Sequence, residues 1–270
     1  TENQKLRFAY GRTVNRPEFR ELAPFLFYDF ELDLNRNGAP DLKTATIDNL
    51  DLRYELYPRL GETISFGAFY KRFTNPIETV VILQSEGQAL TLTNADGAYS
   101  YGAEVEIRKS FKGMTDINFI DNMSVNLNAS VIKSQVDYGS SVNEEVQDVT
   151  RPLQGQSPYV INAVLNYQAD NYGWNVNAAY NIIGPRIFAI GNVDFPTVYE
   201  RPHHAVDLTV TKSFGRSYAF KVGVQDLINE PLRFYQDTNR DRKIEELNDD
   251  MIINFGRDTL FTTSHTYTIK

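Results

Sequence analysis

The sequence predicts an all-β protein, an antiparallel transmembrane β-barrel of the up-and-down type. Three observations predict it: ten runs in which apolar and polar residues alternate, the length of these runs, and the order of long and short connections between them. Alternation with a period of two places successive side chains on opposite faces of a strand. The runs are 5–14, 46–58, 62–73, 100–110, 123–131, 157–169, 173–183, 204–214, 217–227 and 260–270.

The length of the runs favours a membrane barrel over a soluble sheet. Most of them have 10 to 13 residues, about twice the usual length of strands in soluble sheets. A tilted strand needs roughly 9–11 residues to cross the apolar part of a bilayer. Aromatic residues recur near the run ends, where interface belts lie in membrane barrels: Tyr10, Tyr57, Tyr101, Tyr159, Tyr167, Trp174, Tyr180, Phe214 and Tyr218.

The run 123–131, "MSVNLNASV", has one apolar face and one face of asparagine and serine. In a soluble sheet the apolar face would pack into a core. In an outer-membrane barrel it faces lipid, and the polar face lines a wet interior. We expect the second arrangement, with Leu127 in no protein core and Asn126 and Asn128 among polar groups.

The connections alternate strictly between short and long. The short ones are 58–61, 111–120, 170–173 and 215–217, and the long ones are 15–45, 75–97, 138–156, 184–202 and 228–258. Outer-membrane barrels have short periplasmic turns and long external loops. The five long connections are therefore the predicted ligand-binding loops, because binding residues concentrate in loops. Within one of them, 77–94 has two short β runs and is predicted to form a hairpin.

The composition excludes several classes of partner and site. The chain has 27 Lys and Arg against 35 Asp and Glu, a net charge of −8, which disfavours nucleic acid as a partner because phosphate binding needs basic surfaces. It has no cysteine, so disulfides and thiolate metal sites are excluded. No apolar stretch approaches the ~20 residues of a membrane helix.

Several motifs resemble the barrel of TonB-dependent outer-membrane receptors. Their order and spacing carry the resemblance, which covers nearly the whole chain. The motifs are "NRPEFRELAPF" (15–25), "GAPDLK" (38–43), "FTNPIE" (73–78), "LQGQSPYVINAVLNYQ" (153–168) and "GVQDLINEPLRFYQDTNRDRKIE" (223–245).

This resemblance implies a 22-stranded barrel with an N-terminal plug inside it. Residues 1–270 would form one partial barrel domain of about ten C-terminal strands, without the plug and the first half of the barrel. The implied location is the Gram-negative outer membrane, with membrane lipid around a multi-pass barrel. The implied partners are the inner-membrane TonB energy complex, reached through the plug, and an unknown imported ligand. A surface lipoprotein is a further candidate partner.

The function that follows is binding and energy-coupled import of an external ligand, without enzymatic chemistry. Two alternatives stay open at this point. One is a passive outer-membrane porin, and the other is a soluble β-sandwich that binds carbohydrate or adheres to surfaces. Strands shorter than about eight residues would favour the sandwich over the barrel.

One segment has the spacing of a cation-binding loop. Asp237, Asn239 and Asp241 occupy alternate positions, as in an EF-hand loop, and Glu245 is a fourth candidate ligand. Ca²⁺ in the 237–248 loop is the one cofactor considered. The alternative is a surface turn closed by Asx side chains, which is favoured by Arg242 at the position where such loops have glycine.

Other chemistry-bearing residues are assigned structural roles. His203 and His204 are adjacent on a predicted strand and therefore point to opposite faces, so they cannot both bind one metal. In the segment 15–25 the prolines are expected to stiffen the loop, with Phe19 and Phe25 anchoring it. No nucleotide-binding or hydrolase motif occurs in the sequence.

Overall fold

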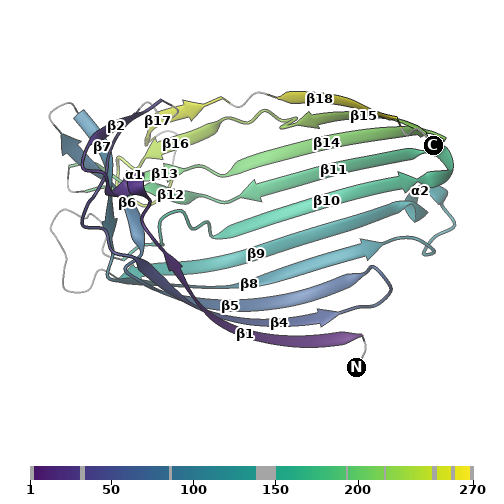
Figure 1. Ribbon diagram of the computed structural model, residues 1–270, viewed down its shortest axis with the longest axis horizontal. Helices are drawn as coiled ribbons and strands as arrows, with labels where there is room; N and C mark the ends of the chain where they lie inside the picture. The colour runs from purple at the N-terminus through teal and green to yellow at the C-terminus, as the bar shows by residue number, and fades with distance from the viewer. Residues whose placement is uncertain are drawn as a thin grey trace.

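Figure 1 shows the computed structural model, in which long strands run side by side from one end of the molecule to the other. The structure describes residues 3–30, 34–84, 87–137, 150–192, 194–215, 217–244, 248–256 and 259–267. Among these residues, no helix is long or apolar enough to cross a bilayer. The helical segments are single turns at α1 (Phe19–Leu22), α2 (Asn118–Asp121) and η1 (Asp170–Tyr172).

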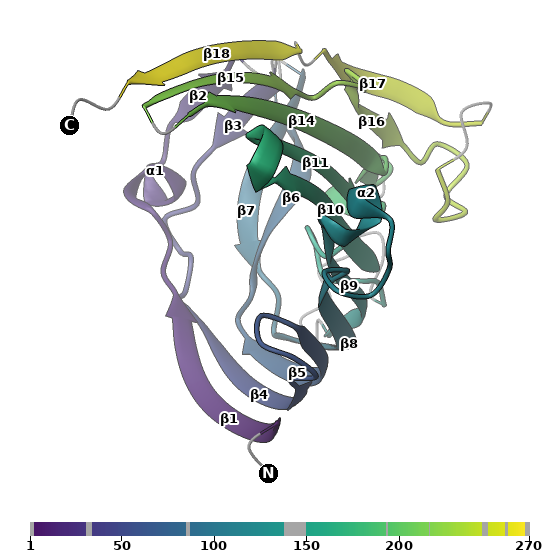
Figure 2. The same cartoon turned by 90° about the vertical axis from the view of Figure 1, so that its right-hand side faces the viewer.

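The long strands form one antiparallel ten-stranded sheet, and each predicted run becomes one of its strands. The sheet is curved like a trough (Figure 2), and its two edges are the first and last strands of the order. The order is β1 (Gln4–Asn15), β4 (Ala45–Leu56), β5 (Thr63–Thr74), β8 (Gly97–Ser110), β9 (Met123–Asp137), β10 (Tyr159–Ala169), β11 (Trp174–Ile183), β14 (His203–Phe214), β15 (Tyr218–Gln225) and β18 (Leu260–Tyr267).

The concave face of this sheet carries polar side chains. Arg53 of β4 and Glu106 of β8 form an ion pair that passes over the intervening strand β5. Their register partners on β5 are Gly67, which has no side chain, and Ser65, whose side chain is small, so there is room for the pair. Side chains two strands apart converge on the concave side of a curved sheet and diverge on the convex side, so this ion pair identifies the concave face.

The convex face is apolar and exposed. Leu6, Phe8, Phe66 and Val131 lie on it, and each is more than half exposed. Exposed apolar side chains in such a continuous band are unusual for a soluble monomer. They are the expected surface of a barrel whose outer wall contacts lipid.

The segment 123–131 follows this division of faces. Leu127 belongs to neither hydrophobic cluster found among the described residues. On the opposite face, Asn128 is aligned with Asn162 of β10, which accepts a hydrogen bond of 2.5 Å from Asn181 of β11. Asn128 is thus among polar groups, as expected, whereas Asn126 is aligned with Arg108 of β8 on one side and with the apolar Val164 of β10 on the other. Contact of Leu127 with lipid stays a prediction.

The described parts of the long connections lie at one end of the sheet and carry two small sheets of their own (Figure 1). The hairpin predicted over 77–94 is confirmed as β6 and β7, whereas the other small strands were not predicted. One sheet has the order β2 (Leu26–Asp29), β3 (Leu34–Asn37), β7 (Gly87–Asn94) and β6 (Ile77–Gln84). The other has the order β12 (Arg186–Ala189), β13 (Val198–Glu200), β16 (Leu232–Gln236) and β17 (Asp250–Phe255).

The short connections lie at the opposite end. One of them turns at Gly173, which has a positive φ of 65°. A Cβ at this glycine would lie 2.4 Å from the backbone oxygen of Ser213, so both the backbone conformation and the close approach require glycine here. The alternation of long and short connections therefore corresponds to two different ends of the sheet.

Candidate functional site: the packed external loops

The predicted ligand-binding loops pack into one unit with its own hydrophobic core. Val81 and Leu90 of the β6–β7 hairpin contact Ala189, Val198 and Phe234 from the second small sheet, and all five are buried. A parallel bridge between Val80 and Ile190 joins the two small sheets. Loops that are far apart in the sequence are thereby held in one arrangement.

A buried ion pair fastens the segment 150–156 to this unit. Arg151 donates two hydrogen bonds, of 2.9 and 2.6 Å, to the two carboxylate oxygens of Glu78. Both side chains are at most 1% exposed. Gln154 extends the connection, because its backbone N–H donates to Glu78 and its side-chain oxygen accepts from the N–H of Thr79. Two-point pairing of this kind fixes geometry as well as charge.

The predicted cation ligands that the structure describes lie in a turn. Their side-chain oxygens accept hydrogen bonds from backbone N–H groups of the same turn. Asp237 is only 4% exposed, and its two carboxylate oxygens accept the backbone N–H groups of Asp241 and Arg242 at 3.1 and 2.9 Å. Asn239 also accepts the N–H of Asp241. Glu245 lies outside the described residues. No group of three His, Cys, Asp or Glu side chains in the described segments could hold a metal ion.

The electrostatics of this turn are set by burial. Desolvation raises the pKa of the Asp237 carboxyl, and the nearby charges of Asp249 and Asp241 raise it further. The hydrogen bonds from the Arg242 and Asp241 N–H groups act in the opposite direction but are outweighed. The geometry is that of an Asx turn. A bound Ca²⁺ therefore stays a prediction.

The side chains of the two histidines lie on opposite faces, as their adjacency predicts. His203 is buried, whereas His204 points to the other face, where its Nδ1 lies 2.8 Å from the hydroxyl of Tyr180. The first loop differs from expectation at both predicted anchors. Phe19 is 95% exposed and Phe25 is 57% exposed, so neither is buried against the rest of the fold. The helical turn of this loop is instead closed by a capping box between Glu18 and Glu21.

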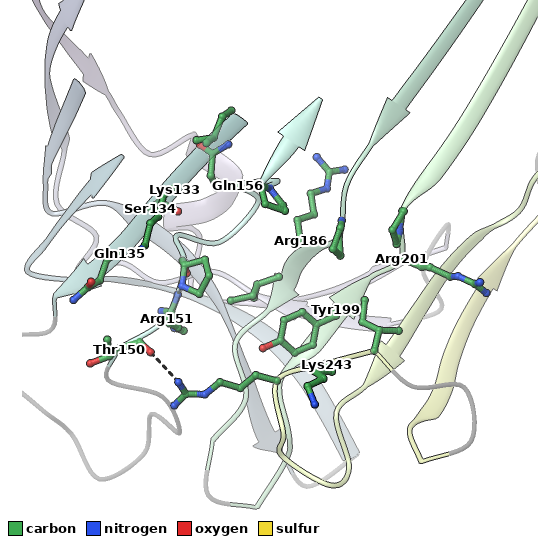
Figure 3. Close-up of a pocket in the computed structure, with 18 residues that line it drawn as sticks. Lys133, Ser134, Gln135, Thr150, Arg151, Gln156, Arg186, Tyr199, Arg201 and Lys243 are labelled. Carbon is green, nitrogen blue, oxygen red and sulfur yellow. Dashed lines mark hydrogen bonds between the residues drawn. The ribbon is translucent and has the colours of Figure 1, made fainter. Parts of the chain in front are cut away.

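A cavity of about 710 Å³ lies beside the packed loops (Figure 3). Its walls come from the end of β9 that carries the long connections, the segment 150–158, the residues between β11 and β14, and the turn 242–244. Six of the lining residues are basic, and no aspartate or glutamate is among the lining residues that the structure describes. The basic residues are Lys133, Arg151, Arg186, Arg201, Arg242 and Lys243.

The rest of the cavity wall is largely apolar. Ile132, Ile187, Ile244 and Tyr199 line it, and four prolines stiffen its edges. Arg186 is held by Glu200 through bonds of 2.7 and 3.0 Å. A cavity with an apolar wall and a cationic rim suits a ligand that has both an apolar body and a negative group.

The buried pair and the cavity could not be predicted from the sequence. Glu78 and Arg151 are 73 residues apart, and no spacing rule connects them. Of the predicted loops, 138–156, 184–202 and 228–258 contribute to the cavity. Residues 138–149 of the first of these lie outside the described residues.

Residues 1–227 match the family model described as TonB dependent receptor-like, beta-barrel. Among curated proteins, none has a matching sequence. Three solved structures with the same fold are useful comparisons, and this chain spans about two fifths of the length of each one.

The first of these structures is a mutant of the ferric enterobactin receptor of Pseudomonas aeruginosa in complex with enterobactin. It is 18% identical with a TM-score of 0.59, and the match covers 99% of this chain and 39% of that one. The siderophore receptor PirA of the same organism is 13% identical, with a TM-score of 0.57 and coverage of 99% and 40%. The copper transporter OprC is 15% identical, with a TM-score of 0.62 and coverage of 98% and 38%.

A curved antiparallel sheet with an apolar convex face, short turns at one end and long loops at the other defines the wall of an outer-membrane β-barrel. The chain belongs to the TonB-dependent receptor β-barrel family. This is a family of receptors and transporters, not of enzymes. The soluble β-sandwich alternative is wrong, because the ten long strands form one sheet rather than two sheets packed face to face.

Proposed function

We propose that the chain forms part of the wall and the external binding face of an outer-membrane receptor that imports its ligand by energy-coupled gating. The observation that carries the proposal is the packed loop unit at one end of the sheet, in a chain of this family. Long loops that share a hydrophobic core and a buried ion pair can present a fixed binding surface, because little ordering entropy remains to be lost on binding.

The concave wall supports a path for a polar ligand. The ion pair between Arg53 and Glu106 and the asparagine pairs of β10 and β11 line this face. Polar interiors are typical of barrels that enclose water or a plug. In this proposal the TonB complex is the energy source, reached through a plug domain, and a surface lipoprotein is a candidate partner at the loops.

The comparison structures suggest which ligands to test first. One is a receptor for ferric enterobactin and another is a copper transporter. A metal ion or a metal chelate is therefore the first ligand class to examine for this protein.

The experiment is uptake by intact cells that lack or express the gene for this protein. Radiolabelled ferric enterobactin and copper ion are the probes, and each is measured with and without a protonophore. The proposal expects gene-dependent uptake of one probe that stops when the proton gradient is removed. Gene-dependent uptake that continues without the gradient would instead identify a passive porin.

A further inference from the structure

One of the short connections is longer than the others and lies on the convex side of the sheet. The connection predicted over 111–120 spans 111–122 in the structure and includes the helical turn α2. In the view from that end of the molecule, α2 lies outside the trough, beside β10 (Figure 2). A contact agrees with this position, because the ring centres of Phe119 and Tyr167 are 5.0 Å apart. Tyr167 lies on the convex face, since it is an odd number of residues along β10 from Asn162 on the concave face.

The segment 111–122 exposes three large apolar side chains. Met114 is 48% exposed, Ile117 is 58% exposed and Phe119 is 59% exposed. The same segment has the exposed charged residues Lys112 and Asp116. A segment that lies in a membrane interface has this combination, with its apolar side chains among the acyl chains and its charged ones in water.

The backbone of the segment is hydrogen-bonded within the segment itself. Met114 donates its N–H to the backbone oxygen of Phe111 at 3.0 Å, and Asp121 donates to that of Ile117 at 3.0 Å. The N–H of Gly113 donates to the carboxylate of Asp121. Unpaired backbone groups are costly in a bilayer, so these internal bonds lower the cost of placing the segment against acyl chains.

The segment lies at the level of exposed aromatic residues at the same end of the convex face. Trp174 is 41% exposed and Tyr218 is 42% exposed. Tyr167, which Phe119 contacts, is aligned with Val176, two residues from Trp174 on the same face of β11. Aromatic girdles mark the boundary between the apolar core and the headgroups of a bilayer. The exposed side chains of the segment therefore continue the apolar convex face at its boundary.

We propose that the segment 111–122 inserts Met114, Ile117 and Phe119 into the periplasmic leaflet of the outer membrane, at the boundary between acyl chains and phospholipid headgroups. The occupant of this surface is lipid because the surface is continuous with the convex face, which is apolar up to the aromatic residues. The inference rests on the outer-membrane location and orientation in the proposed function. It does not depend on the imported ligand or on the energy source.

The test is fluorescence quenching of the full-length protein in vesicles of phosphatidylethanolamine and phosphatidylglycerol. A bimane probe is attached to a single cysteine at position 117, 116 or 171, after any other cysteine of the full-length protein has been replaced. Asp116 is the matched control within the segment, and Asn171 is an exposed residue of a neighbouring short connection. Phospholipid brominated near the headgroup end of its acyl chains quenches probes in the membrane, and iodide quenches probes in water.

We expect brominated phospholipid to remove most of the fluorescence at position 117 and little of it at 116 and 171, where iodide should be the stronger quencher. Quenching at 117 by iodide but not by brominated phospholipid would overturn the proposal and leave the surface to a periplasmic protein. The direction in which the protein enters the vesicle does not matter, because the segment is beside the bilayer in both directions.

A second measurement is urea unfolding in the same vesicles. Met114→Ser with Ile117→Ser should lower the folding equilibrium constant about tenfold or more, because the apolar area of two side chains is lost from the membrane. Asp116→Ser should change this constant by no more than about twofold, as for other surface substitutions. Equal effects of the two variants would contradict insertion. Neither measurement involves transport, so a failed uptake experiment leaves both results interpretable.

Discussion

At the residue scale, the most consequential feature is the buried pair of Glu78 and Arg151. Each charge is tolerable only because the other neutralises it and because Gln154 donates to the same carboxylate. An uncompensated buried charge is strongly unfavourable, whereas a well-packed apolar pair of similar size can be neutral. The pair therefore specifies how the loops fit together more than it adds net stability.

Replacing Arg151 by Met should loosen the external unit by about 3–5 kcal/mol, because it leaves Glu78 charged and buried. Amide hydrogen exchange of 77–94 measures this loss. The control is Arg186→Met, which breaks a similar pair with Glu200 whose arginine is 35% exposed and should cost less, about 1–3 kcal/mol, because Glu200 is nearly buried. The double substitution Glu78→Leu with Arg151→Met should recover most of the protection. Equal effects of the two single variants would contradict this account.

The raised pKa of Asp237 predicts that the stability of the turn 237–244 depends on pH. The folded pKa of this carboxyl is raised above the ordinary 3.8 by burial. Between that ordinary value and the raised one, the folded turn binds a proton that the unfolded chain does not, so stability falls as pH rises through this window. Amide exchange of 237–244, corrected for intrinsic rates, should show this fall, and Asp237→Asn should remove it. An opposite slope would show that hydrogen bonding outweighs desolvation.

At the element scale, the strands of the large sheet were predictable and those of the loops mostly were not. A run such as 123–131 carries its pattern locally, because one face is apolar along the whole strand. The strands β12 and β13 have four and three residues, too few for a period to be visible. They exist because Phe234 and Val81, from distant segments, cover them.

The two faces of β9 give a matched pair of substitutions. Leu127→Lys places a charge on the convex, lipid-facing side and should cost about 2–4 kcal/mol near the bilayer midplane. Asn128→Lys places the same charge on the polar concave side and should cost much less. Urea unfolding of the protein inserted in vesicles measures both. A larger cost for Asn128→Lys would reverse the assignment of the faces.

Amide exchange in the turn 237–244 tests whether the predicted Ca²⁺ is needed for the fold of this turn. Its N–H groups already donate to Asp237 and Asn239, so the fold of the turn is accounted for by the protein alone. Removing Ca²⁺ with EGTA should then leave amide exchange in 237–244 unchanged. A large increase in exchange, reversed by added Ca²⁺ and lost in Asp237→Asn, would instead establish the cation site.

At the scale of the whole molecule, sequence and structure agree that one end of the large sheet carries the long connections and the other end carries the short ones. The order of connection lengths predicted which loops gather at one end. It could not predict that they share a core or enclose a cavity, because those contacts join residues such as Leu90 and Phe234. The central claim is therefore the topology of the chain in the outer membrane. The long connections lie outside the cell, the short ones face the periplasm, and the convex face contacts lipid.

Because the chain has no cysteine, single cysteines can report this topology directly. Thr238→Cys marks a long connection, and Lys112→Cys and Asn171→Cys mark two short ones; all three side chains are exposed. Intact cells are treated with a membrane-impermeant maleimide before and after disruption of the outer membrane. We predict that position 238 is labelled in intact cells, and positions 112 and 171 only after disruption. Labelling of 112 or 171 in intact cells, with 238 protected, would contradict the account.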